Sequence, residues 1–114
     1  MSKESIKKLI LQYATMIESR KFANAMRIYQ EVKKNLEKGK WSDGYLKALR
    51  GIFLVKKIGD NYAFFGNKDL DLNSLKRELR RFRKSVKDPL LSDFDKGYFA
   101  AVTDYTRALI KLKR

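Results

Sequence analysis

Apolar residues recur at intervals of three and four along most of the chain, which is the spacing of one face of an α-helix. The pattern predicts five helices, over residues 3–19, 22–36, 41–57, 74–87 and 92–111. Because the first two are joined by only a short break, they are expected to fold back antiparallel. We therefore expect an all-α fold, in which residues 1–114 form a single compact bundle of about five helices in antiparallel helical hairpins.

The connection between the first two predicted helices, with the start of the second, carries a recognisable sequence pattern. Phe22 is followed by Ala25 three positions on and by Tyr29 four positions further. The stretch from Lys21 to Tyr29 resembles the turn and second helix of a tetratricopeptide unit, although Arg20 stands where that family has glycine. The resemblance covers one hairpin, and it implies the geometry of that hairpin without a function.

Several helix ends are marked by residues with capping chemistry. Trp41-Ser42-Asp43 is typical of a helix start, because short polar side chains accept hydrogen bonds from the N–H groups of the first turn. Gly39 is expected to end the preceding helix. Asp71 or Asn73 is expected to cap the fourth helix, and Pro89 closes it, since the residue before a proline is pushed out of helical geometry.

Residues 59–72 are the least regular part of the chain. Turn-forming glycine, aspartate and asparagine residues surround the apolar run Tyr62-Ala63-Phe64-Phe65. A small hairpin is one interpretation, although two short strands alone are marginally stable. The preferred interpretation is an irregular aromatic loop, between the third and fourth helices, that fills the helical core.

Two segments share one short pattern, an aromatic residue followed by two polar residues and Gly-Tyr. They are Trp41–Leu49 and Phe94–Val102. A glycine inside a helix costs about 1 kcal/mol relative to alanine, so a pair in equivalent places favours close backbone contact. We expect the two helices to cross near Gly44 and Gly97, with a packing role; the alternative is a chance repetition.

Composition excludes most chemistry. The 114 residues contain no Cys and no His, so disulfides, thiol nucleophiles, thiolate zinc sites and histidine bases are absent. The pairs Asp69/Asp71 and Asp93/Asp95 could hold Mg²⁺, but each pair precedes a predicted helix, where acids serve as caps. We expect no enzymatic activity, no cofactor and no metal. The chain also lacks a signal-peptide pattern and a long apolar stretch, which predicts a cytoplasmic protein without a membrane partner.

The net charge of +14 is unevenly distributed. Residues 1–40 and residues 73–87 each carry a net charge of +6. A basic surface would attract polyanions if the two segments lay on one side of the fold, which the sequence leaves open. The alternative is a merely solvated surface, such as that of a thermophilic protein.

The fourth predicted helix concentrates this charge. Leu75, Leu79, Phe82 and Val86 form its apolar stripe, and nearly all other positions are basic. The candidate nucleic-acid-binding residues are Lys76, Arg77, Arg80, Arg81, Arg83, Lys84 and Lys87. Candidate supporting residues elsewhere are Lys7, Lys8, Lys33, Lys34, Lys111, Lys113 and Arg114.

Arginine binds phosphate through two parallel hydrogen bonds and stacks on bases, so this helix suits nucleic acid. We expect a small basic protein that binds nucleic acid, RNA slightly more than DNA, through phosphate contacts. The alternative is a non-enzymatic helical adaptor or self-associating domain, whose partner would be another protein or a second copy of the chain.

Overall fold

The structure is a computed structural model that describes residues 3–60, 63–66 and 70–113, without the side chains of residues 3 and 4. The described residues form five α-helices and one short 3₁₀ turn and contain no strand, which confirms the all-α prediction. The elements are α1 (Lys3–Glu18), α2 (Phe22–Asn35), α3 (Lys40–Ile58), η1 (Phe64–Gly66), α4 (Leu72–Val86) and α5 (Asp93–Lys113).

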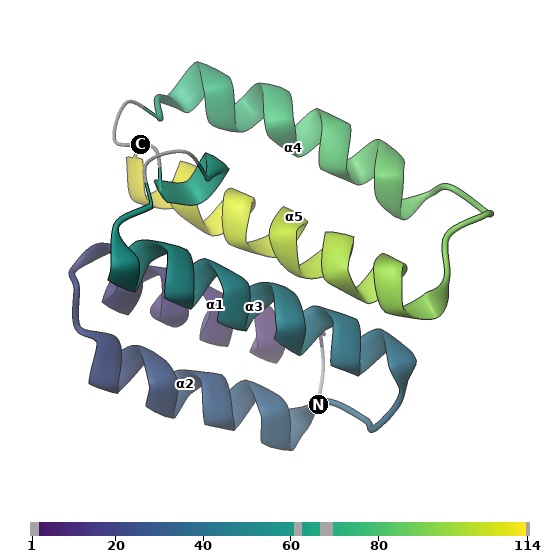
Figure 1. Cartoon of the computed structure of the whole chain (residues 1–114), viewed down its shortest axis with the longest axis horizontal. Helices are drawn as coiled ribbons and strands as arrows, with labels where there is room; N and C mark the ends of the chain where they lie inside the picture. Colours follow the sequence, from purple (N-terminus) through teal and green to yellow (C-terminus); the bar gives the residue numbers. More distant parts are fainter. Residues whose placement is uncertain (1–2, 61–62, 67–69, 114) are drawn as a thin grey trace.

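α5 lies at the centre of the bundle. Figure 1 shows α4 along one side of α5, α3 and α1 on the other side, and α2 at the edge farthest from α4. α1 and α2 form an antiparallel hairpin, as do α4 and α5, while α3 and α5 run in the same direction. Because helices flank it on both sides, α5 contributes the longest series of buried residues, from Gly97 to Ile110.

Three buried tyrosines link the three inner helices in a ring. Tyr13 of α1 donates to the backbone oxygen of Leu49 on α3 at 2.7 Å. Tyr45 of α3 donates to Asp104 on α5 at 2.8 Å, and Tyr105 of α5 donates to Glu18 on α1 at 3.0 Å. All three tyrosines are 0% exposed, so each hydroxyl is paired where an unpaired one would be costly.

α3 and α5 cross at the two glycines that the repeated pattern singled out. A Cβ added to Gly44 would overlap the backbone oxygen of Phe94, and one added to Gly97 would overlap that of Trp41. Each glycine therefore faces the aromatic residue that begins the other pattern. The predicted crossing is confirmed, and its role is close packing of two parallel helices.

Most helix ends differ from the predicted ones by one or two residues, and Gly39 has a different role. α2 ends at Asn35, and Gly39 is the N-cap residue of α3 instead of the end of α2. The α3 cap makes no side-chain hydrogen bond, because glycine has no side chain. Ser42, which the sequence places at the helix start, lies inside α3, and its hydroxyl donates to the backbone oxygen of Glu37. In the connection between α1 and α2, Arg20 adopts a left-handed conformation (φ 60°) at the position where the tetratricopeptide pattern has glycine.

The aromatic loop packs on the core as expected. Phe64 and Phe65 are half-buried, with the Phe65 ring edge-on to Tyr105 at 5.3 Å and the Phe64 ring edge-on to Phe82 at 6.1 Å. The described part of the loop is a 3₁₀ turn, so it does not form the alternative hairpin. Tyr62, which the prediction included, lies outside the described residues.

Candidate nucleic-acid interface

α4 is held on the molecule by one apolar stripe. Leu75 is buried, and Leu79 and Phe82 pack against the core. Asp71 caps the helix, since its side chain accepts a hydrogen bond from the Ser74 backbone N–H at 2.8 Å. Hydrogen bonds from Ser74 also hold the pKa of the Asp71 carboxyl below its ordinary value. The predicted cap and three of the four stripe residues have these roles, whereas Val86 is half-buried and lines a pocket. One side of α4 is therefore docked, and its other sides face outward.

All seven predicted basic residues of α4 are exposed: Lys76, Arg77, Arg80, Arg81, Arg83, Lys84 and Lys87. Within the described part of the chain, α5 is the only helix in contact with α4, and Figure 1 shows α4 at the rim of the bundle. No other helix therefore covers the basic face.

Little of the positive charge on α4 is neutralised within the helix. The ion pair recorded there among the described residues joins Arg81 to Glu78 at 3.4 Å, and the Arg81 side chain is 75% exposed. Arg77 donates to the hydroxyl of Ser74 at 3.3 Å. Exposed pairs of this kind are worth about 0–1 kcal/mol, so they leave the guanidinium groups ready to bind an external anion.

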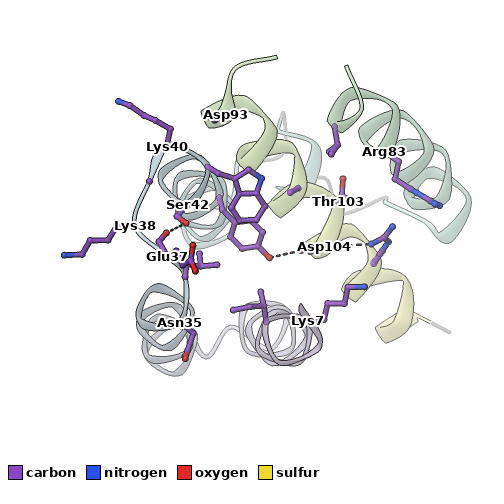
Figure 2. A pocket seen from close by; sticks show the side chains of 18 of the residues that line it. Lys7, Asn35, Glu37, Lys38, Lys40, Ser42, Arg83, Asp93, Thr103 and Asp104 are labelled. Atoms are coloured by element: carbon purple, nitrogen blue, oxygen red, sulfur yellow. Dashed lines mark hydrogen bonds and ion pairs between the residues drawn. The ribbon is translucent and has the colours of Figure 1, made fainter. Parts of the chain in front are cut away.

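A pocket of about 970 Å³ opens near the C-terminal end of α4. Its walls come from all five α-helices, α2 contributing only its last residue Asn35, and from the connection between α2 and α3 (Figure 2). The described lining includes three acidic residues, Glu37, Asp93 and Asp104, and six basic ones, Lys7, Lys38, Lys40, Arg83, Lys87 and Arg107. The two basic segments, residues 1–40 and 73–87, therefore meet at this pocket.

An aromatic pair forms part of the pocket wall. The Trp41 ring stacks on Tyr45, with 5.1 Å between ring centroids and 20° between planes. Tyr45 is completely buried and donates to Asp104, which also lies 3.8 Å from the guanidinium of Arg107. Trp41 is 40% exposed, so the indole is supported on one face while part of its surface remains open.

Thr103 places a buried polar group at the same pocket. The residue is 5% exposed, and its hydroxyl has no hydrogen-bond partner among the described residues. Thr106, one turn further, instead donates to the backbone oxygen of Val102 at 2.7 Å. Figure 2 shows the Thr103 hydroxyl directed from α5 toward the space beside α4. A buried hydroxyl without a partner costs about 1–3 kcal/mol, so this group is available to a ligand.

The predicted supporting residues are not gathered in one place. Lys7 lines the pocket, whereas Lys33 and Lys34 lie on α2, at the opposite edge of the bundle from α4. Lys34 is also paired with Glu31 at 3.6 Å. The others, Lys8, Lys111 and Lys113, are exposed but are not among the lining residues, and Arg114 lies outside the described residues.

The described residues of the two acidic pairs lie at the N-terminal ends of helices. Asp93 and Asp95 lie in the first turn of α5, and Asp71 caps α4, while Asp69 lies outside the described residues. The described side chains include no cluster of three or more His, Cys, Asp or Glu that could hold a metal ion. No described helix has the length and apolar character that crossing a bilayer requires.

Sequence reasoning missed Trp41, Thr103, Asp104 and Arg107 as site residues. Trp41 was assigned only to a helix start and to packing. No sequence signal marks Thr103, because a threonine on a buried helix face commonly pairs with a backbone oxygen one turn earlier, as Thr106 does with Val102.

Comparison of the chain with protein-family models, with curated proteins and with solved structures finds no match. The function must therefore be argued from the basic face of α4 and the adjoining pocket.

Proposed function

We propose that this chain binds nucleic acid, RNA in preference to DNA, through phosphate contacts on the exposed basic face of α4. The observation that carries the proposal is that all seven basic side chains of α4 and its C-cap residue Lys87 are exposed, while the described contacts of this helix are with α5 and Phe64. Four of the seven are arginines, whose planar guanidinium groups match phosphate oxygens in pairs. The proposed activity is binding without catalysis.

A preference for single-stranded RNA over duplex DNA follows from the aromatic group beside this face. Proteins recognise single-stranded RNA largely by stacking its unpaired bases on aromatic side chains. Trp41 offers a partly exposed indole in the pocket that Arg83 and Lys87 of α4 also line. In a DNA duplex the bases are already stacked on each other, so only the phosphate contacts would remain.

Charge reversal of α4 tests the proposal. Replacing Arg77, Arg80, Arg81 and Lys84 together with glutamate should weaken binding of a labelled mixed-sequence RNA on the order of a hundredfold at low salt. Phosphate neutralisation releases counterions, so log affinity falls linearly with log salt, and the variant should flatten that slope by up to about 3. Fluorescence anisotropy across a salt series measures both quantities.

A matched control separates the α4 face from net charge alone. Lys21, Arg27, Lys33 and Lys34 are exposed at or near α2, and their reversal to glutamate changes the net charge equally. The control should retain most of the affinity if α4 is the site, after circular dichroism has confirmed that both variants are folded. Equal losses in the two variants would contradict a site on α4. An absence of RNA binding by the unaltered chain would favour the protein-interaction alternative.

A further inference from the structure

We infer that the pocket between α3, α4 and α5 binds one unstacked nucleotide, whose base stacks on Trp41 and whose phosphate lies near Lys7, Arg83 and Arg107. The nucleotide can belong to a single-stranded RNA, in which case the inference rests on the proposed function, or it can be a free nucleoside monophosphate. The pocket volume of about 970 Å³ lies within the range of roughly 300–1,000 Å³ that is typical of ligand sites.

Trp41 is arranged to receive a base. Tyr45 holds one face of the indole at 5.1 Å, and Tyr45 is itself fixed by its hydrogen bond to Asp104. A ring supported in this way loses little conformational freedom when a ligand stacks on its open surface. Stacking on an aromatic side chain tolerates every base, so the indole itself sets no base preference.

The phosphate position follows from the charges. Figure 2 shows Lys7 and Arg83 on the same side of the pocket as Thr103 and Asp104, whereas Lys38 and Lys40 lie on the other side and point away. Arg107 joins the first group through its 3.8 Å approach to Asp104. Asp104 accepts from Tyr45, and it is the one carboxylate labelled on this side of Figure 2, where Lys7, Arg83 and Arg107 line the pocket. This side therefore retains positive charge for an anionic group.

Thr103 supplies an independent indication of a ligand. Its hydroxyl is buried and lacks a partner, and it does not bond to its own helix as Thr106 does. A hydroxyl can both donate and accept, so a phosphate or ribose oxygen could pair with it. The unpaired Thr103 hydroxyl thus lies at the basic side of the pocket that the partly exposed indole of Trp41 also lines.

The pocket is continuous with the basic face of α4. Arg83 and Lys87 belong to that face and also line the pocket. A single strand bound along α4 would therefore reach the pocket at the C-terminal end of the helix, where one nucleotide could leave the strand and stack on Trp41. A duplex could not supply a base in this way without unpairing it.

The intrinsic fluorescence of Trp41 tests the inference directly, because it is the only tryptophan in the chain. Titration with a single-stranded RNA or with adenosine monophosphate should quench the emission saturably, since a stacked base contacts the indole. Inorganic phosphate and a blunt RNA duplex are controls that present charge without an available base, and they should leave the emission nearly unchanged.

Single substitutions test each contact, with binding measured by the fluorescence anisotropy of a labelled single-stranded RNA. Trp41→Leu should weaken binding about fivefold or more, while Trp41→Phe keeps an aromatic face and should retain most of the affinity. Thr103→Val has nearly the same shape and should weaken binding severalfold without lowering Tm, because it removes a hydroxyl that is unpaired in the free protein. Unchanged affinity in both Trp41→Leu and Thr103→Val would overturn the inference.

The outcomes also separate this inference from the proposed function. RNA that binds with a steep salt slope but leaves Trp41 emission unchanged would overturn the pocket site and leave the α4 site standing. Quenching by adenosine monophosphate without RNA binding would support the pocket as a free-nucleotide site and overturn the proposed function. Equal quenching by inorganic phosphate would overturn the role of the base.

Discussion

Replacing either Gly44 or Gly97 with alanine should lower the free energy of unfolding by about 3 kcal/mol or more, because the added methyl group has no space. At Gly44 the new Cβ would lie 2.8 Å from the carbonyl carbon of Phe94, and at Gly97 it would lie 2.7 Å from that of Trp41. Both obstacles are backbone atoms, which cannot rotate aside as a side chain would. Relief requires α3 and α5 to separate, and this would disturb the central packing of the bundle.

Gly51 provides the matched control in the same helix. A Cβ added there meets nothing within 4 Å, so Gly51→Ala should stabilise the chain by about 1 kcal/mol through helix propensity alone. Thermal melts followed by circular dichroism should show a Tm at least 10 °C lower for Gly44→Ala and Gly97→Ala, and slightly higher for Gly51→Ala. A Gly44→Ala variant with unchanged Tm would contradict the close crossing.

The helices could be predicted from the sequence because each buries apolar residues at helical spacing. α4 shows this most clearly, since Leu75, Leu79 and Phe82 are its core contacts and every basic residue among them is exposed. The crossing of α3 and α5 was also accessible, because only glycine permits such contact and the two glycines stand in equivalent patterns. Local spacing was sufficient in both cases.

Helix ends were harder to predict because several residues compete for the same role. Ser42 and Gly39 both suit a helix terminus, and the sequence pattern does not say which backbone group each will satisfy. In the structure the Ser42 hydroxyl donates to the backbone oxygen of Glu37, across the connection, and α3 starts after Gly39. The outcome depends on how α2 and α3 are placed, which is a tertiary effect.

One part of the candidate site could be predicted from local sequence, and the other depends on how the helices pack. The basic face of α4 belongs to a single helix, so its residues follow from helical periodicity. The pocket instead combines Lys7, Trp41, Arg83 and Arg107 from four helices, and no local pattern brings them together. Thr103 illustrates the limit, because its hydroxyl is unusual only when compared with the partners that the folded chain offers.

Raising the pH above about 10 should destabilise the protein steeply through the ring of buried tyrosines. Burial raises the pKa of Tyr13, Tyr45 and Tyr105 above the ordinary value of 10.0, and neighbouring charge from Asp104 and Glu18 raises the pKa of the last two further. Above pH 10 the unfolded chain releases these protons while the folded chain keeps them, so stability is fully present below pH 10 and falls as pH rises. Each phenol contributes about 1.4 kcal/mol per pH unit, or about 4 kcal/mol per unit for the three.

Urea unfolding between pH 8 and 11 measures how the free energy of unfolding falls with pH. Single substitutions show which tyrosines cause this slope. Tyr13→Phe removes one buried phenol, so the slope should fall by about one third. The loss at pH 8 should be roughly 0.5–1.5 kcal/mol, for one hydrogen bond to the Leu49 oxygen, which keeps its partner within α3. Tyr98→Phe is the matched control, because Tyr98 is 38% exposed and outside the ring, and it should leave the slope unchanged. If Tyr13→Phe left the slope unchanged as well, groups other than the buried tyrosines would govern alkaline unfolding. If the slope fell as expected, the same three hydrogen bonds that join α1, α3 and α5 would account for both the packing of the bundle and its alkaline limit.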